Sequence, residues 1–131
     1  MIRIVLADDA DDIRRLVRFV LDRDERFSVV GEAADGAQAL ELVEAERPDL
    51  LLLDLAMPNV DGLEVLEDLR HRVDGPVVVV LSGFTNAEAV NEVLALGASS
   101  FVSKGESITD LPNVLAAAVA PPAGSQPPTP G

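Results

Sequence analysis

The sequence of residues 48–58 is PDLLLLDLAMP, in which four consecutive leucines stand between Asp49 and Asp54. A short apolar run with prolines and acidic residues on both sides is typical of a strand, because helices of globular proteins are usually longer. A strand that is apolar on both faces is buried on both faces, as in a parallel sheet with helices above and below it. Residues 50–53 are therefore predicted to form a central strand, with Asp54 at its carboxyl end.

Four more strands are predicted around this one, and apolar residues with helical spacing separate each strand from the next. These strands are Ile2–Ala7, Phe27–Ala33, Pro76–Leu81 and Ser100–Ser103. The helix boundaries are signalled by Asp35 with Gln38, by Arg47-Pro48, by the capping box Thr85–Glu88, by Gly97, and by Thr109 or Asp110 before Pro112. Five strands alternating with five helices predict an α/β fold with a parallel sheet covered on both faces.

The charge and composition exclude several classes of function. The chain has 131 residues with 10 basic and 23 acidic side chains, which give a formal net charge of −13. Such a charge repels a phosphate backbone, so direct binding to nucleic acid is not expected. The absence of cysteine excludes thiol chemistry. Apolar runs such as Val77–Leu81 are far shorter than the roughly 18 residues of a membrane span, so no contact with a membrane is expected.

The length predicts one domain, which we place at residues 1–119. Residues 120–131 contain five of the nine prolines and two glycines, a composition typical of a linker or a disordered tail. Met1 leads directly into Ile2 and Arg3 without the pattern of a targeting segment. We therefore expect a cytoplasmic protein.

Polar side chains follow four of the five predicted strands at the point where each strand ends. They are Asp8 and Asp9 after the first strand, Asp54 after the third, Ser82 after the fourth and Lys104, the only lysine, after the fifth. Any single aspartate here could serve as a turn former or a helix cap, and Asp11 and Asp12 are interpreted as first-turn acids that the helix dipole stabilises. Because ligands of parallel sheets bind outside the carboxyl ends of the strands, the whole set predicts a polar site at this edge.

Closely spaced carboxylates cannot all ionise at low cost unless a cation binds among them. Oxygen ligands without histidine or cysteine favour Mg²⁺. A carboxylate beside Mg²⁺ can attack phosphorus and become an aspartyl phosphate. In phosphoryl transfer the protein mainly positions groups and neutralises charge, which suits Lys104 as an ammonium and Ser82 as a hydroxyl donor. These residue types therefore point to phosphoryl chemistry at a magnesium site.

The set of residues resembles the receiver domain of bacterial two-component response regulators. The matching positions are Asp8-Asp9, Asp54-x-x-Met57-Pro58, Asp61-Gly62, Ser82-Gly83, Phe101 and Lys104. The resemblance covers residues 1 to about 119. It implies a flavodoxin-like, doubly wound sheet of five parallel strands in the order 2-1-3-4-5, with five helices. It also implies that Asp54 accepts phosphate from the phosphohistidine of a sensor kinase.

The resemblance assigns a metal site residue by residue. Asp9 and Asp54 would be direct Mg²⁺ ligands, and Asp8 would act mainly through water. The backbone carbonyl of Ala56 would complete the protein's share. Lys104 would pair with the Asp54 carboxylate and then with its phosphoryl group.

The resemblance also implies a switch and its partners. Ser82 would turn toward the phosphoryl group, and Phe101 would swing into the space that Ser82 leaves. This movement would reshape the face made by the fourth helix, the fifth strand and the fifth helix, where partners dock. The implied partners are a sensor histidine kinase or phosphotransfer protein, an output protein or domain, and a second copy in a homodimer formed on phosphorylation. The chain would not be an enzyme, beyond assisting its own phosphorylation and dephosphorylation.

The sequence departs from the family pattern at several positions. Gly105 stands where the family commonly has proline, Gly83 replaces the commoner alanine, and Phe101 lacks the hydroxyl of the frequent tyrosine. Ala56 and Phe84 stand at positions that help to set the lifetime of the phosphoryl group. Because neither side chain can orient an attacking water, we expect slow self-hydrolysis.

Two other functions compete with this interpretation. A phosphohydrolase of the haloacid dehalogenase type also uses an aspartyl nucleophile, and Asp9-Ala10-Asp11 has its Asp-x-Asp form. That enzyme needs a second acidic pair after the lysine, where only Glu106 and Asp110 follow, and it would leave Asp54 without a role. The other alternative is a receiver-like interaction module without phosphorylation, whose usual sign is loss of the acidic pair, the acceptor or the lysine.

Overall fold

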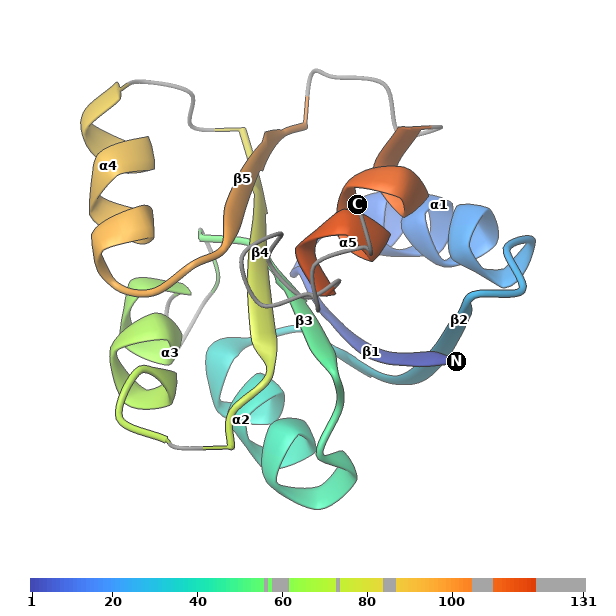
Figure 1. Ribbon diagram of the computed structural model, residues 1–131, viewed down its shortest axis with the longest axis horizontal. Helices are drawn as coiled ribbons and strands as arrows, with labels where there is room; N and C mark the ends of the chain where they lie inside the picture. Colours follow the sequence, from blue (N-terminus) through green and yellow to red (C-terminus); the bar gives the residue numbers. More distant parts are fainter. Residues whose placement is uncertain (56, 58–61, 73, 84–86, 105–109, 120–131) are drawn as a thin grey trace, which may run out of the picture.

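The computed structural model describes residues 1–55, 57, 62–72, 74–83, 87–104 and 110–119. Strands and helices alternate through this part of the chain (Figure 1), in the order β1 (Ile2–Ala7), α1 (Asp11–Asp22), β2 (Phe27–Ala33), α2 (Gly36–Glu46), β3 (Leu50–Leu53), α3 (Gly62–Leu69), β4 (Val77–Ser82), α4 (Ala87–Ala95), β5 (Ser100–Ser103) and α5 (Leu111–Val119). Four strands have the predicted bounds. β4 begins one residue later than predicted, because Pro76 has no N–H to donate, and it continues through Ser82.

The five strands form one parallel sheet in the order β2-β1-β3-β4-β5, as the resemblance implied. The chain passes from β1 outward to β2 and then crosses back to β3 on the other side of β1. This reversal places the topological switch point between the carboxyl ends of β1 and β3. Both strands are internal to the sheet, so the residues that follow them lie at the middle of its edge.

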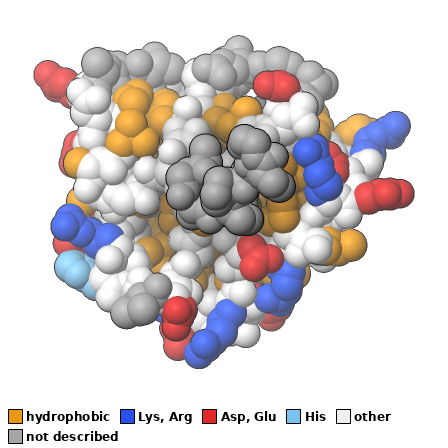
Figure 2. Space-filling model, viewed as in Figure 1, with side chains coloured by type: hydrophobic (Ala, Val, Ile, Leu, Met, Phe, Trp, Pro, Cys, Tyr) orange, Lys and Arg blue, Asp and Glu red, His pale blue; other side chains and the backbone are white. Residues whose placement is uncertain are grey.

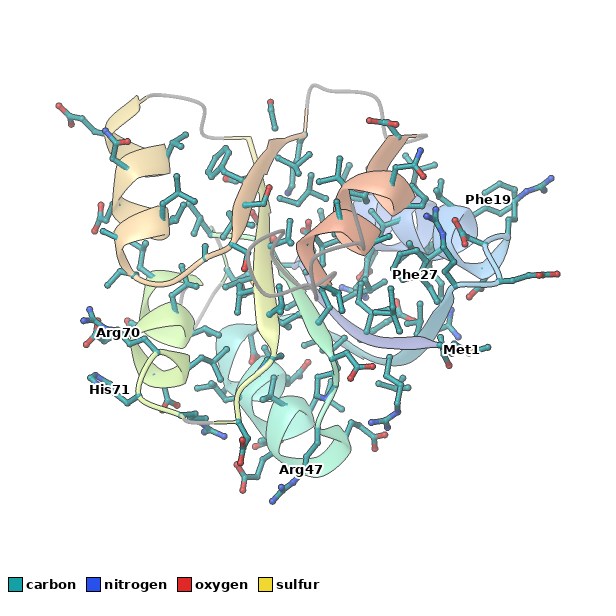
Figure 3. The ribbon with its side chains drawn as sticks, in the orientation of Figure 1. Met1, Phe19, Phe27, Arg47, Arg70 and His71 are labelled. Atoms are coloured by element: carbon teal, nitrogen blue, oxygen red, sulfur yellow. The ribbon has the colours of Figure 1, made fainter. Side chains whose placement is uncertain are left out.

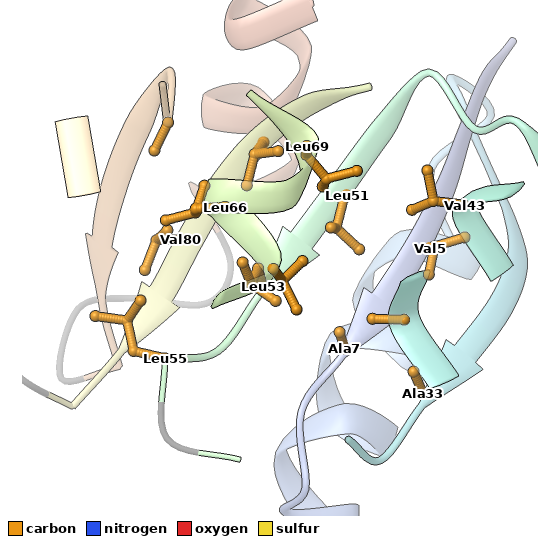
Figure 4. Close-up of a cluster of buried hydrophobic side chains, with 14 of the residues drawn as sticks. Val5, Ala7, Ala33, Val43, Leu51, Leu53, Leu55, Leu66, Leu69 and Val80 are labelled. Carbon is orange, nitrogen blue, oxygen red and sulfur yellow. The ribbon is translucent and has the colours of Figure 1, made fainter. Parts of the chain in front are cut away.

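The two faces of the sheet are covered by different helices. Alternate residues of β3 point to opposite faces, so Leu51 and Leu53 pack with α2, α3 and α4, whereas Leu50 and Leu52 pack with α1 and α5. Figure 4 shows the first of these two cores, with Leu66 of α3 over the sheet. None of the four leucines is more than 4% exposed, which confirms the prediction of a strand buried on both faces.

The predicted boundaries of α2 and the predicted end of α4 are confirmed. Asp35 caps α2 by accepting a hydrogen bond from the backbone N–H of Gln38 at 2.8 Å. Gly97 ends α4 with a φ of +104°, and its N–H and that of Ala98 donate to carbonyls in the last turn of the helix. At the end of α2, Arg47 adopts the left-handed conformation rather than the extended one that Pro48 predicts. Figure 3 shows the Arg47 side chain at this end of the molecule. The capping box Thr85–Glu88 begins outside the described residues.

Charged side chains of both signs lie around the edge of the face drawn in Figure 2. The single histidine, His71, follows α3 with its side chain 69% exposed, and Figure 3 places it beside Arg70 at the surface. Its Nε2 lies 3.1 Å from Oε1 of Glu67, and this hydrogen bond lowers the pKa of the Glu67 carboxyl. Within the described residues, no helix combines the length and the apolar character that crossing a lipid bilayer requires.

Candidate functional site

The register of the sheet brings the carboxyl ends of four neighbouring strands to one level. Ala7 pairs with Leu53, Leu53 pairs with Val80, and Ser82 pairs with Ser103. The residues that end or follow these strands therefore share one edge, although they lie far apart in the sequence. They are Asp8 and Asp9 after β1, Asp54 after β3, Ser82 at the end of β4 and Lys104 after β5. The predicted convergence of these polar residues is confirmed by this geometry.

Three of these polar residues are deeply buried. Asp8, Asp54 and Ser82 are 6%, 3% and 0% exposed, whereas Asp9 is exposed. Buried carboxylates are costly unless hydrogen bonds or charges compensate them. Two of them lie at the switch point of the sheet, where the ligands of parallel sheets bind. Burial at this place favours a functional role for Asp8 and Asp54.

The three aspartates form a group that could hold a metal ion. Asp8, Asp9 and Asp54 each offer a carboxylate oxygen, and these oxygens lie within 4.8 Å of one another. The donor set is oxygen only, which suits a hard cation such as Mg²⁺ better than zinc or copper. The acids also repel one another at this separation, so a divalent cation among them would relieve the repulsion. The chemistry of the donor set therefore fits magnesium.

Lys104 is the cation that the structure places against this group. Its Nζ lies 3.1 Å from Oδ2 of Asp8 and 3.4 Å from Oδ2 of Asp54. Burial lowers the pKa of Lys104, but the hydrogen bond to Asp8 and the charges of Asp54 and Asp8 outweigh burial, so the pKa rises above its ordinary value. Lys104 is therefore an ammonium at neutral pH. The shorter contact with Asp8 was not predicted from the sequence, which paired Lys104 with Asp54.

Backbone hydrogen bonds fix the segments that carry these side chains. The N–H of Asp8 donates to the carbonyl of Ala33 at 3.0 Å, and that of Asp54 donates to the carbonyl of Ala7 at 2.9 Å. The N–H of Lys104 donates to the carbonyl of Ser82 at 2.9 Å. Each bond continues the ladder of the sheet by one residue beyond a strand. The functional groups are thus held by the sheet itself rather than by free loops.

Gly62, at the start of α3, lies directly against the backbone that follows Asp54. A Cβ on Gly62 would come within 2.5 Å of the Asp54 carbonyl oxygen and 2.6 Å of the Leu55 Cα. The N–H of Gly62 donates to the carbonyl of Leu55 at 3.0 Å. The Asp61-Gly62 pair was part of the sequence pattern. Only the structure shows that position 62 must lack a side chain because the backbone of Asp54 and Leu55 lies against it.

Of the remaining predicted residues, some lie within the described part of the chain and others lie outside it. Phe101 is half-buried in β5 and packs against the core on the α2, α3 and α4 side of the sheet. The backbone of Ala56, the proposed third part of the metal site, lies outside the described residues, as do Pro58, Asp61, Phe84 and Gly105. Arg14 of α1 was not singled out in the sequence, yet its side chain contacts the carbonyl of Asp8.

Comparisons with known proteins agree with this geometry. The family model of the response regulator receiver domain matches residues 4–116. A protein-glutamate methylesterase/protein-glutamine glutaminase of Koribacter versatilis is 40% identical over 112 residues, which are 82% of this chain and 31% of that protein. A putative transcriptional regulator of Pseudomonas aeruginosa is 40% identical over 111 residues, which are 85% of this chain and 53% of that protein. The chain thus spans between about a third and about half of these curated relatives.

A solved structure has the same fold. The signal receiver domain of the putative response regulator NarL from Mycobacterium tuberculosis superposes with a TM-score of 0.82 at 37% sequence identity, covering 89% of this chain and 95% of that one. Three observations point to the same family: the strand order, the acidic edge of the sheet and the match over residues 4–116. This chain belongs to the family of response regulator receiver domains.

Proposed function

We propose that Asp54 accepts a phosphoryl group from the phosphohistidine of a sensor histidine kinase or phosphotransfer protein, in a Mg²⁺-dependent reaction. The observation that carries this proposal is the Asp54 carboxylate, which is buried at the switch point, 3.4 Å from the Lys104 ammonium and grouped with Asp8 and Asp9. The direct test is incubation with Mg²⁺ and a small acyl phosphate, followed by intact mass. We expect one added phosphoryl group.

Asp9 and Asp54 would hold the metal directly and Asp8 mainly through water, with the backbone carbonyl of Ala56 as a further ligand. Mg²⁺, when bound, would supply positive charge beside the oxygens of the phosphoryl group. An oxygen of Asp54 forms the new bond to phosphorus as the bond from phosphorus to the donor nitrogen breaks. The electron pair of the broken bond stays on the imidazole of the donor. The product is an acyl phosphate on Asp54.

Lys104 supports the proposed transfer by neutralising charge. Its ammonium already spans Asp8 and Asp54, so a short movement of Nζ brings it to a phosphoryl oxygen on Asp54. Lys104→Ala is expected to slow phosphoryl incorporation on the order of a hundredfold, because a preorganised charge is lost. The rate of mass increase with an acyl phosphate measures this effect, and circular dichroism checks the fold. An unchanged rate in folded Lys104→Ala would contradict the role.

A switch from the site to a binding face is proposed for Ser82 and Phe101. Ser82 ends β4 and is fully buried, and Phe101 lies in the neighbouring strand β5, opposite Val80. The hydroxyl of Ser82 would turn toward the phosphoryl group, and Phe101 would move inward. The dianionic group would thereby bias a two-state equilibrium of the α4-β5-α5 face, where an output protein, an output domain or a second copy would bind.

The phosphoryl group is expected to be long-lived. Ala56 and Phe84 lie outside the described residues, and the expectation rests on their chemistry, since neither side chain has a polar group to orient water. The purified phosphorylated protein, freed of donor, should lose its phosphoryl group over minutes or longer, as followed by intact mass. Ala56→Asn, which introduces an amide, should shorten the lifetime. Loss from the wild type within seconds would contradict the proposal.

The geometry favours this function over the two alternatives. A haloacid dehalogenase reaction would use Asp9 and Asp11, but the Asp11 carboxylate pairs with Arg14 at 2.6 Å. Lys104 contacts Asp8 and Asp54 instead. An interaction module without phosphorylation would not need the acidic pair, the acceptor and the lysine together. We further propose that residues 1–119 act as a cytoplasmic phosphoacceptor without an external substrate, joined to residues 120–131 as a linker or tail.

A further inference from the structure

Arg14 of α1 turns back toward the loop that carries the acidic pair. Its side chain is only 17% exposed, and it has three hydrogen-bond partners. Nη1 donates to the backbone carbonyl of Asp8 at 2.5 Å, Nη2 to Oδ1 of Asp11 at 2.6 Å, and Nε to Oε1 of Glu32 at 3.2 Å. The guanidinium therefore joins the β1–α1 loop, the first turn of α1 and the strand β2.

The carbonyl that Arg14 binds belongs to the peptide between Asp8 and Asp9. The other polar groups of Asp8 are also held: its N–H donates to Ala33, Oδ1 accepts from the N–H of Ala10 at 2.9 Å, and Oδ2 meets Lys104. The hydrogen bond from Arg14 thus holds the peptide plane between Asp8 and Asp9 in one orientation. The orientation of this plane sets the direction in which the Asp9 side chain points. Asp9 is exposed, so side-chain packing does little to orient it.

An arginine suits this position better than a lysine. The planar guanidinium has five N–H donors in a fixed fork and serves three acceptors at once, whereas an ammonium is a point charge on a flexible stem. Glu32 anchors the arrangement, because it accepts from Arg14 and also from Arg18, one turn further along α1. Arg18 has no hydrogen bond or ion pair with the acidic loop among those found in the described residues, and its partners are Glu32 and Asp22.

We infer that Arg14 is a positioning residue for the metal site: it orients Asp9 through the Asp8 carbonyl and so sets the affinity for Mg²⁺ without touching the ion. The inference rests on the proposed magnesium site. Replacing a residue that orients a metal ligand without touching the metal typically lowers metal affinity by roughly 10–100-fold. Charge alone predicts the opposite sign, because removal of a cation near a divalent cation tightens binding. The direction of the change therefore separates positioning from electrostatics.

The test is a Mg²⁺ titration of the full chain by calorimetry or by NMR, for the wild type, Arg14→Ala, Arg14→Lys and the control Arg18→Ala. Arg14→Ala should weaken Mg²⁺ binding about 10–100-fold. Arg14→Lys should also weaken it although the charge is kept, and Arg18→Ala should bind like the wild type. Urea unfolding in chelator shows that each variant is folded under the titration conditions, and Arg14→Lys decides the question if Arg14→Ala does not fold.

The possible failures are distinguishable. Binding by Arg14→Ala and Arg14→Lys as tight as the wild type, or tighter, would overturn the positioning role and leave the magnesium site intact. Equal weakening in Arg18→Ala would also overturn it, since the partners of Arg18 are Glu32 and Asp22 and not the acidic loop. A wild type that does not bind Mg²⁺ would overturn the proposed site itself and this inference with it.

Discussion

Asp54→Asn should abolish phosphoryl incorporation from an acyl phosphate or a phosphohistidine donor. An amide is a far weaker nucleophile than a carboxylate, and the substitution also removes one of the three acidic groups proposed to hold Mg²⁺. The amide has nearly the same shape as the carboxylate, so the fold should persist. Intact mass after incubation with the donor and Mg²⁺ measures the effect.

Asp49→Asn provides the matched control for Asp54→Asn. Asp49 directly precedes the other end of β3, where its carboxylate accepts a hydrogen bond from the backbone N–H of Arg3 at 2.8 Å. The same chemical change at that end of the strand should leave phosphoryl incorporation at the wild-type level. Incorporation that survives in Asp54→Asn would refute Asp54 as the acceptor.

Gly62→Ala should destabilise the fold by about 1–3 kcal/mol, the usual cost of excess volume in a tightly packed place. The new Cβ would meet backbone atoms of Asp54 and Leu55, and backbone cannot move aside as the end of a flexible side chain can. The few tenths of a kcal/mol that alanine gains by restricting the unfolded chain are too small to offset this contact. Because the displaced backbone carries Asp54, phosphoryl incorporation should also fall in the folded fraction. Urea unfolding measures the stability.

Gly83→Ala is the control for Gly62→Ala, because a Cβ on Gly83 would have no neighbour within 4 Å. Its stability should equal or slightly exceed that of the wild type. If Gly62→Ala and Gly83→Ala unfold at the same urea concentration as the wild type, the close approach at position 62 does not constrain the site segment.

Much of the fold could be predicted because its signals are local. Leu50–Leu53 is apolar at every position, and the structure buries every one of these side chains. Asp35 and Gln38 have the spacing of a helix cap, and the predicted hydrogen bond is present. The polar residues at strand ends could be predicted to meet because parallel strands bring their carboxyl ends to one edge.

The remaining features depend on contacts between elements. Arg14 reaches the Asp8 carbonyl only because α1 packs beside β2, where Glu32 anchors it. Val30 has no partner in the pairing of β1 with β2, since Ile4 pairs with Val29 and Val5 pairs with Gly31. Pro48 predicts an extended Arg47, but two hydrogen bonds hold the left-handed turn. The carbonyl of Arg47 accepts from the side chain of Arg3, and the N–H of Arg47 donates to the carbonyl of Val43 in α2. Such features follow from tertiary packing and leave no local pattern in the sequence.

The most direct test of Mg²⁺-dependent phosphorylation is the intact mass of the wild-type chain after incubation with a small acyl phosphate, with Mg²⁺ and with Mg²⁺ removed by a chelator. We expect one added phosphoryl group per chain with Mg²⁺ and almost none with the chelator, because the grouped carboxylates of Asp8, Asp9 and Asp54 repel an anionic donor unless a cation is bound. No added mass in the presence of Mg²⁺, or equal incorporation without it, would contradict Mg²⁺-dependent phosphorylation of this chain.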